Sequence, residues 1–337
     1  MKSQLIHKYN EIISVENLLS AWQDFLIGKR SKADVQIFSL NLMDNILQLH
    51  HDLANRVYKH GGYQSFYVTD PKLRHIHKAG VRDRLLHHAI YRQLYPFFSR
   101  IFIADSYSCQ LGKGTHKALQ RFIKMANKVS RNNTRTCWIL KGDIKKFFDN
   151  IDQNILLKIL EEYISDYNMQ QLLSEIICSF NTASGKGLPL GNLTSQLFVN
   201  IYMNEFDQFV KRGLKEKFYI RYADDFIIFS CERNSLWPTL LLIEDFLFKE
   251  LGLILHPHKI ELKTIFSGMD FLGWIYFPFH KVLRTKSKKR MMQRINVSSN
   301  KSATLASYLG LLKHGNAFNL QQVLLNIYWL LEEGNNE

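Results

Sequence analysis

The chain has 337 residues, enough for one large domain with lobes or for two or three smaller units. Hydrophobic residues make up 46% of it and aromatic residues 13%, which excludes an intrinsically disordered chain. It has 44 lysines and arginines against 30 aspartates and glutamates, and therefore a net charge of +14. This excess of positive charge indicates a polyanionic partner, and nucleic acid is the first candidate.

The sequence also indicates where the protein resides. The N-terminus does not resemble a signal peptide, and no apolar run reaches the roughly 18 residues that a membrane span needs. The four cysteines are isolated, without the paired spacing of a zinc site or a disulfide framework. We therefore expect reduced thiols, no membrane contact and a cytoplasmic location.

The first third of the chain has the pattern of helices interrupted by one hairpin. Residues 11–60 have apolar side chains at spacings of three and four, which predicts helices. Residues 63–80 predict a short β-hairpin. A helix should follow from Asp83 and stop at Pro96, because proline cannot donate its backbone hydrogen bond. A long basic helix is expected to run to about residue 131.

The rest of the chain alternates between strands and helices. Asp152 is a plausible N-cap, and Asn192 or Thr194 could cap the helix that follows a Gly- and Pro-rich loop. The expected elements are a strand at 137–144, a helix after residue 152, a helix to 209, a hairpin at 217–230, a helix to 251, a pair of short strands to 279 and a helical tail from about 286. This order predicts an α+β fold with an antiparallel sheet floored by helices.

Two adjacent carboxylates lie at the tip of the second hairpin, in Tyr222-Ala223-Asp224-Asp225. Like charges repel, so the pair gains nothing for folding unless a cation binds there. A third acid, Asp143, ends the upstream strand. If the strands are neighbours, the three carboxylates converge, and hard oxygen ligands of this kind bind Mg²⁺ for two-metal nucleotidyl transfer. A simple polar turn is the alternative.

Around these acids the chain resembles a reverse transcriptase. Five motifs occur in the order of that family and extend over most of the chain, from about Lys72 to Arg294. They are Asp143-Ile-Lys-Lys-Phe-Phe-Asp149, Gly187-Leu-Pro-Leu-Gly-Asn-Leu-Thr-Ser-Gln196, Tyr222-Ala-Asp-Asp225, Gly252-Leu-Ile-Leu-His-Pro-His-Lys259 and Phe271-Leu-Gly273. A single motif of this length would be weak, whereas five in order form a specific pattern.

The resemblance implies a right-hand polymerase that copies RNA into DNA from dNTPs. The fingers with an N-terminal helical extension would cover 1–135, the palm 136–280 and the thumb 281–337. Two Mg²⁺ ions, with Mn²⁺ as a substitute, would be held by the catalytic residues Asp143, Asp224 and Asp225. The basic segment 286–294 would begin the thumb and hold duplex backbone, unless it is a plain solvated helix.

The resemblance also assigns residues that contact the nucleotide. Lys72, Arg74 and Arg82 would bind the triphosphate, although a solvated charged face is the simpler interpretation. Phe148 would be a steric gate against a 2′-hydroxyl, unless it and Phe147 are both core residues. The remaining substrate-binding positions are Ile144, Leu190, Gly191, Gln196 and Tyr222.

Two of these motif positions carry separate hypotheses. Leu190 stands where the family more usually has Gln. The leucine removes a polar contact near the incoming nucleotide, so we hypothesise that the enzyme incorporates wrong nucleotides more often. Lys259 would protonate the leaving pyrophosphate as a general acid, or is an ordinary surface lysine.

One branch of the family fits best. The strings Leu190-Gly-Asn-Leu-Thr-Ser-Gln196 and Gln110-Leu-Gly-Lys-Gly-Thr-His116 resemble diversity-generating retroelement reverse transcriptases. That branch implies a dedicated template or noncoding RNA, an RNA–DNA hybrid and a small accessory protein. Three alternatives remain open: an antiphage-defence reverse transcriptase that copies its own noncoding RNA, a non-catalytic RNA-binding scaffold, and an RNA-dependent RNA polymerase, against which Phe148 argues.

Overall fold

The computed structural model describes residues 3–6, 8–70 and 72–333, and the chain forms two compact units. The first unit contains Met1–Gly114, Gly142–Phe226 and Pro238–Ile260. The second contains Thr115–Lys141, Ile227–Trp237 and Glu261–Glu337. All of the predicted catalytic residues therefore belong to the first unit.

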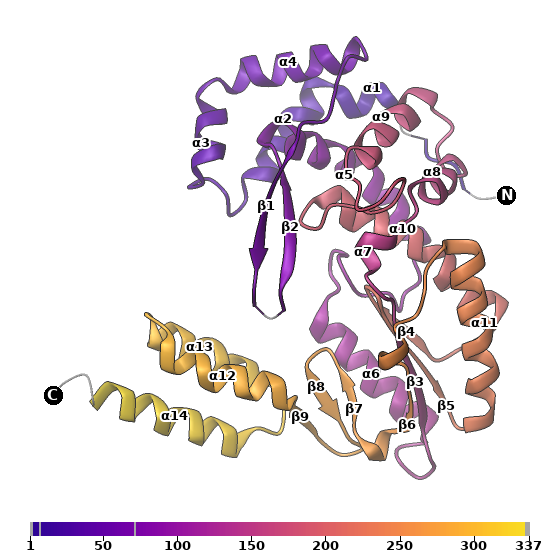
Figure 1. Ribbon diagram of the computed structural model, residues 1–337, viewed down its shortest axis with the longest axis vertical. Coiled ribbons are helices and arrows are strands. Elements are labelled where there is room, and N and C mark those ends of the chain that lie inside the picture. Colours follow the sequence, from indigo (N-terminus) through magenta and orange to yellow (C-terminus); the bar gives the residue numbers. More distant parts are fainter. Residues whose placement is uncertain (1–2, 7, 71, 334–337) are drawn as a thin grey trace. The chain divides into compact units, whose positions relative to one another are not determined.

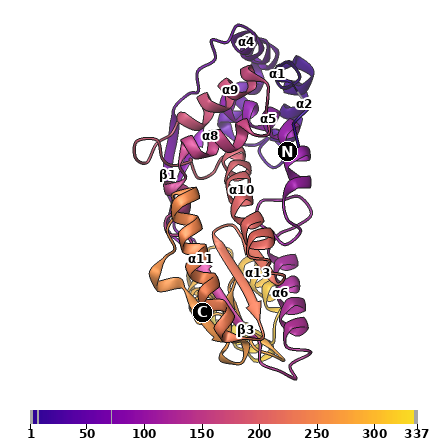
Figure 2. The same cartoon turned by 90° about the vertical axis from the view of Figure 1, so that its right-hand side faces the viewer.

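Helices form most of the first unit, and four of them gather in one bundle, α5, α8, α9 and α10 (Figure 1 and Figure 2). Asp152 caps α8 as predicted, because its side chain accepts hydrogen bonds from the backbone N–H groups of Asn154 and Ile155. The helices are α1 (Tyr9–Ile13), α2 (Val15–Leu26), α3 (Ala33–Leu40), α4 (Leu42–Ala54), α5 (Val81–Ile101), α7 (Phe147–Asn150), α8 (Gln153–Glu161), α9 (Tyr167–Cys178), α10 (Leu193–Gln208), the π-helical turn η1 (Phe209–Gly213), α11 (Arg233–Leu251, which begins in the second unit) and the 3₁₀ turn η2 (Pro257–Lys259).

The prediction that Pro96 stops a helix is wrong. Helix α5 continues through this proline to Ile101. An interior proline costs a helix about 3 kcal/mol, because one hydrogen bond is lost and the ring crowds the preceding turn. Leu94, Tyr95 and Phe98 on either side of it are all buried. Burial of this apolar face outweighs the local cost.

The described residues form three sheets, each with antiparallel strand pairs. Strands β1 (Tyr63–Val68) and β2 (Arg74–Ala79) form the predicted hairpin, with Tyr63 opposite Ala79 and Val68 opposite Arg74. A four-stranded sheet has the order β4-β5-β3-β6, and β3 pairs antiparallel with β6. Its strands are β3 (Trp138–Asp143), β4 (Tyr219–Tyr222), β5 (Asp225–Ser230) and β6 (Glu261–Thr264). The boundary between the two units passes through β3 and β5.

The second unit has its own core. The ring of Phe122, on α6 (Thr115–Val129), lies 5.1 Å from the ring of Phe229 and 4.6 Å from that of Tyr276. A sheet of order β7-β8-β9 and a group of three helices complete the unit. The strands of this sheet are β7 (Met269–Phe271), β8 (Trp274–Tyr276) and β9 (Lys281–Leu283), preceded by the 3₁₀ turn η3 (Ile265–Ser267). The helices are α12 (Thr285–Val297), α13 (Lys301–Leu312) and α14 (Phe318–Glu333).

The prediction of a single strand pair between residues 251 and 279 is therefore wrong, because β6, β7 and β8 lie there and β9 follows. Three of these four strands, β7, β8 and β9, have only three residues each. Such strands are too short to show an alternating pattern. The mixed α+β class with antiparallel sheets is confirmed. None of the helices in the described ranges combines the length and the apolar character that a bilayer crossing requires.

Candidate active site

Asp143 ends strand β3 and is buried, at 6% exposed. Its neighbour Gly142 lies against the start of β5, because a Cβ atom added there would meet the ring of Phe226 at 2.4 Å. Only glycine permits so close an approach. The end of β3 therefore touches the start of β5, where Asp225 is the first residue.

The turn between β4 and β5 consists of Ala223 and Asp224. Ala223 has a φ angle of 55°, in the left-handed region that residues other than glycine rarely adopt. The side chain of Arg221 supports this backbone, since its Nη1 donates a hydrogen bond to the carbonyl oxygen of Ala223 at 2.9 Å. A hydrogen bond from the charged side chain of Arg221 thus stabilises the strained turn.

Arg221 is itself anchored by a buried ion pair. Its Nε and Nη2 atoms donate to the two carboxylate oxygens of Asp207 on α10, at 2.7 Å each. Both residues are at most 1% exposed. Tyr219 also donates to Asp207, and Ser106 accepts from Arg221 at 3.0 Å. Sequence reasoning missed this network, although an arginine inside an otherwise apolar strand was a visible signal.

The carboxyl groups of Asp143 and Asp224 interact through their charges. Burial raises the pKa of Asp224 above its usual value, and the neighbouring charge of Asp143 raises it further. The positive charges of Lys259 and Lys72 act in the opposite direction on the pKa of Asp224. The structure therefore brings two predicted catalytic acids and two predicted cationic residues into one electrostatic neighbourhood.

Lys259 reaches the site because its segment pairs with the end of β3. The backbone N–H of His256 donates to the carbonyl of Asp143 at 2.7 Å, and that of Lys145 donates to Ile254 at 2.9 Å. The 3₁₀ turn η2 then directs Lys259 back toward β3. Its Nζ lies 2.5 Å from Oδ1 of Asp143. Lys259 is thus paired with a predicted catalytic acid.

Within the described ranges, no three or more His, Cys, Asp or Glu side chains are grouped as a ready-made metal site. The chemistry of the acids nevertheless fits a divalent cation. Burial and the neighbouring charge of Asp143 disfavour the ionised form of Asp224. Lys259 supplies the positive charge beside Asp143. A hard cation bound by the same oxygens would relieve this repulsion.

The loop before α10 is bonded to the hairpin β1–β2. The N–H of His77 donates to the carbonyl of Leu190 at 2.9 Å. Asn192 accepts from the N–H of Ala79 at 3.3 Å and donates to the carbonyl of His77 at 2.8 Å. Gly191 has a φ angle of +115°, and an added Cβ would meet Ile76 at 2.8 Å.

The predicted side-chain cap of α10 is therefore wrong. Asn192 occupies the N-cap position, but its side chain makes no capping hydrogen bond. Thr194 lies inside the helix. The carboxamide of Asn192 bonds to strand β2 instead, and so links the loop to the hairpin.

Other predicted contact residues lie around the acids in varied environments. Phe147 is buried, whereas Phe148 is half-buried, with its ring edge-on to that of Phe147 at 5.6 Å. Ile144 is buried and forms a backbone bridge with Leu255. Gln196 and Tyr222 are half-buried.

The three predicted triphosphate ligands divide into two kinds. Lys72 and Arg74 are exposed at the end of the hairpin, and the charge of Lys72 reaches Asp224. Arg82 instead forms an ion pair with Asp52 at 2.6 Å and lies over the ring of Tyr58 at 4.8 Å. The structure therefore gives Arg82 partners within the protein itself.

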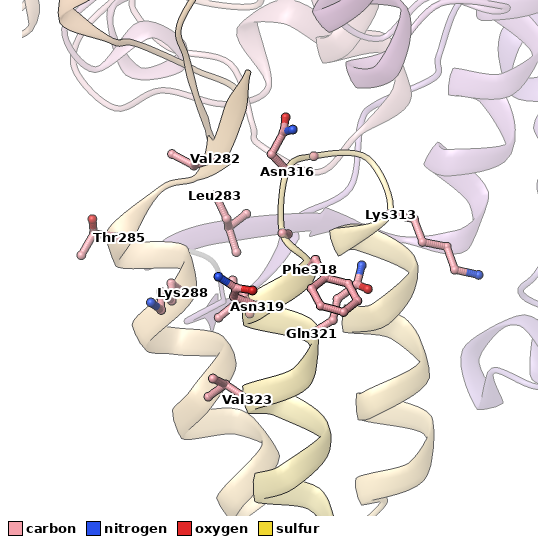
Figure 3. Close-up of a pocket in the computed structure, with 13 residues that line it drawn as sticks. Val282, Leu283, Thr285, Lys288, Lys313, Asn316, Phe318, Asn319, Gln321 and Val323 are labelled. Atoms are coloured by element: carbon pink, nitrogen blue, oxygen red, sulfur yellow. The ribbon is translucent and has the colours of Figure 1, made fainter. Parts of the chain in front are cut away.

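A separate hollow of about 820 Å³ lies in the second unit, between β9, the start of α12 and α14 (Figure 3). Lys288, Lys313, Asn316 and Phe318 are among its lining residues. None of the residues predicted for catalysis or nucleotide binding lines it, although Lys288 belongs to the basic segment 286–294.

The motifs and the fold now define the class of the protein. Residues 59–276 match the family "Reverse transcriptase (RNA-dependent DNA polymerase)", and the chain belongs to this family. Protein YkfC of Escherichia coli (strain K12) is 26% identical over 318 residues, covering 82% of this chain and 78% of that protein. The group II intron-encoded protein LtrA of Lactococcus lactis subsp. cremoris is 26% identical over 184 residues, covering 52% of this chain and 29% of that protein.

The fold comparison agrees. Apo telomerase from Candida Tropicalis superposes with a TM-score of 0.50 at 12% identity, covering 73% of this chain and 51% of that chain. The predicted right-hand polymerase fold is confirmed by this comparison. The family match confirms the prediction of an RNA-directed DNA polymerase. This chain spans about half of the telomerase chain and less than a third of LtrA.

Proposed function

We propose that this chain copies RNA into DNA by nucleotidyl transfer at Asp143, Asp224 and Asp225. The observation that supports it best is the electrostatic interaction between the carboxyl groups of Asp143 and Asp224. The two residues lie where the end of β3 touches the β4–β5 hairpin. The three carboxylates would hold two Mg²⁺ ions, or Mn²⁺ in their place. When bound, such ions activate the primer hydroxyl and stabilise charge on the leaving group.

The surrounding residues would position the reactants. Arg221 holds the turn that presents Asp224, and Lys259 keeps an ammonium group beside Asp143, from which it could give a proton to the departing pyrophosphate. The ring of Phe148 would pack against the sugar of the incoming nucleotide and leave no room for a 2′-hydroxyl. Gly191 lets the backbone approach the base pair closely.

The remaining predicted contacts complete the proposed site. Lys72 and Arg74 would bind the triphosphate. Arg82 would stabilise the segment after the hairpin through its ion pair with Asp52. Ile144, Leu190, Gln196 and Tyr222 would line the nucleotide site. We further propose fingers at 1–135, palm at 136–280 and thumb at 281–337.

Primer extension tests the proposed reaction. The purified chain is given an RNA template, a DNA primer, dNTPs and Mg²⁺, and we expect the primer to lengthen. Asp224→Asn should abolish extension, whereas the matched surface variant Asp245→Asn should extend normally. Extension by Asp224→Asn at the wild-type rate would exclude the proposed catalytic acids. Incorporation of ribonucleotides by Phe148→Ala but not by the wild type would support the gate.

We also propose that the template is a dedicated RNA of a diversity-generating retroelement, read with a small accessory protein. Support comes from Leu190 in the loop that bonds to the hairpin, where the family more usually has glutamine. Loss of that polar contact would loosen selection opposite template adenine.

Sequencing the products of wild type and Leu190→Gln tests this assignment. We expect frequent errors at template adenines in the wild type and fewer in the variant. Equal error rates would contradict the fidelity hypothesis. A structured noncoding RNA recovered with the purified protein and copied accurately would instead favour the antiphage-defence alternative.

A further inference from the structure

One face of the hairpin β1–β2 carries a row of rings that the proposed reaction does not use. The rings of Tyr67 and His75 stack 4.4 Å apart, with planes only 9° from parallel. The ring of His75 lies 4.2 Å from that of His77, and His77 lies 4.6 Å from Phe180. Phe180 comes from the loop after α9. We call these four side chains the ring row.

Part of this arrangement has a structural explanation. Tyr67 and His75 are directly opposite each other in the antiparallel pair, and such cross-strand pairs stabilise a hairpin. Tyr63 contacts Phe180 edge-on at 5.5 Å and fixes the inner end of the row. The pairing explains why the rings touch one another, but it does not explain why they remain open to solvent.

The outer half of the row is exposed, whereas His77 and Phe180 at its inner end are half-buried. Tyr67 is 64% exposed, and His75 is exposed as well. In Figure 1 the hairpin extends away from helices α2 and α5, so its outer end is not covered by the helices of its own unit. Aromatic surface left in water is costly, which indicates a partner with flat apolar faces.

The two faces of the hairpin differ in their contacts. On the opposite face, Lys78 forms an ion pair with Asp34 at 2.6 Å, and Ile76 lies against Gly191 of the loop before α10. The inner end of that face is held against the rest of the unit, whereas Phe66, nearer the turn than Lys78, is 46% exposed. The ring row differs in that its exposed rings already stack on one another, so this face presents a preformed flat surface to an extended ligand.

We propose that the ring row is a stacking platform for unpaired bases of the RNA strand, an inference that rests on the proposed function. Every base has a π-face, so stacking on Tyr and His rings tolerates any template sequence. The adjacent exposed Lys72 and Arg74 match the charge of the phosphates. Because the charge of Lys72 reaches Asp224, the outer end of the hairpin lies near the catalytic turn.

Equilibrium binding of a fluorescent, unstructured single-stranded RNA to the full chain tests the platform. Tyr67→Ala and His75→Ala should each raise the Kd on the order of tenfold. Tyr67→Trp should bind like the wild type, because the platform needs a ring and not a hydroxyl. The matched control is Phe66→Ala, which removes a ring of 46% exposure from the neighbouring position on the opposite face.

The salt dependence separates stacking from charge. Tyr67→Ala should leave the slope of log Kd against log salt unchanged, because that slope counts phosphate contacts. Lys72→Ala and Arg74→Ala should reduce it. A blunt RNA–DNA duplex, which offers no unpaired bases, should bind Tyr67→Ala and the wild type equally.

Two results would overturn the platform. One is wild-type RNA affinity in both Tyr67→Ala and His75→Ala. The other is an equal loss in Phe66→Ala, which would mean that the hairpin has merely been destabilised. Failure of the wild type to add a deoxynucleotide to a primer would reject the proposed function instead, since RNA binding is measured without dNTPs.

Discussion

At the scale of single residues, Asp224 connects the chemistry of the site to the stability of the fold. Its pKa in the folded chain is raised, chiefly by burial and then by Asp143. The folded state therefore binds this proton more tightly than the unfolded state does. Stability falls as pH rises through the interval between the unfolded and the folded pKa, and above the folded pKa the full destabilisation remains.

Asp224→Asn should accordingly stabilise the protein while removing most of its activity. We expect a higher Tm than the wild type at pH 7 and a difference that shrinks at acidic pH, where the wild-type carboxyl is protonated. Nucleotide addition should fall by roughly 10³-fold, since metal-assisted charge stabilisation is worth several kcal/mol. Thermal unfolding at both pH values and single-nucleotide addition provide the measurements. A Tm difference that does not vary with pH would contradict the electrostatic explanation.

The buried pair of Arg221 and Asp207 should be needed for both folding and catalysis. Arg221→Ala leaves the Asp207 carboxylate buried without its partner, so we expect a loss of about 3–5 kcal/mol in the free energy of unfolding, measured by urea denaturation. The double variant Arg221→Met with Asp207→Leu removes both charges and should recover most of that loss.

The double variant also separates stability from positioning. It cannot donate to the carbonyl of Ala223, so the turn that presents Asp224 loses its support. We expect kcat to stay low with an unchanged KM for dNTP, although the protein is folded. Full recovery of kcat together with stability would show that the arginine serves the fold alone.

At the scale of elements, the bond between the hairpin and the loop before α10 should control nucleotide binding. Asn192 is only 2% exposed, and its side chain joins Ala79 and His77 of β2. Asn192→Ala removes both hydrogen bonds and leaves buried backbone groups unsatisfied, at a cost of about 1–3 kcal/mol.

We expect Asn192→Ala to raise the KM for dNTP more than it lowers kcat, because the loosened hairpin carries Lys72 and Arg74. Hydrogen exchange should show faster exchange at His77 and Ala79 and unchanged exchange in α8. The control Asn154→Ala changes an exposed asparagine on α8. A Kd for dNTP equal to that of the wild type would rule out the coupling.

Elements with local signals could be predicted from the sequence, and those decided by distant partners could not. The hairpin at 63–80 and the Asp152 cap depend on neighbouring residues, and both were predicted correctly. Asn192 bonds to a residue 115 positions away, so its local sequence indicated a helix cap instead. Pro96 was misjudged for a similar reason, because tertiary burial decides whether α5 continues.

The same distinction applies to the site. The order of motifs was enough to select Asp143, Asp224 and Lys259, which the structure brings together. The ion pair beneath the turn was not predicted, because Asp207 lies 14 residues before Arg221 on a different element. Sequence motifs selected residues that lie together in the fold, whereas the residues that support them become visible only in the structure.

At the scale of the whole molecule, the net charge of +14 should make RNA binding strongly dependent on salt. Helix α12 contributes a dense group of exposed cations, Lys286, Lys288 and Lys289. If they bind phosphates, each releases a counterion, and affinity falls steeply as salt rises. Changing the three lysines to glutamine should lower the slope of log Kd against log salt for an RNA–DNA duplex by about 0.9 for each phosphate that is no longer neutralised.

A charge-matched variant distinguishes direct phosphate binding from general attraction. Lys158→Gln, Lys215→Gln and Lys217→Gln together remove the same charge from exposed positions on the first unit. Long-range attraction is screened beyond about 8–10 Å at physiological salt, so this variant should weaken binding mainly at low salt and keep most of the slope. If the two triple variants change the slope equally, net charge alone governs binding. A larger change for the α12 variant would identify that helix as a surface that holds the duplex backbone, as the thumb of a polymerase must.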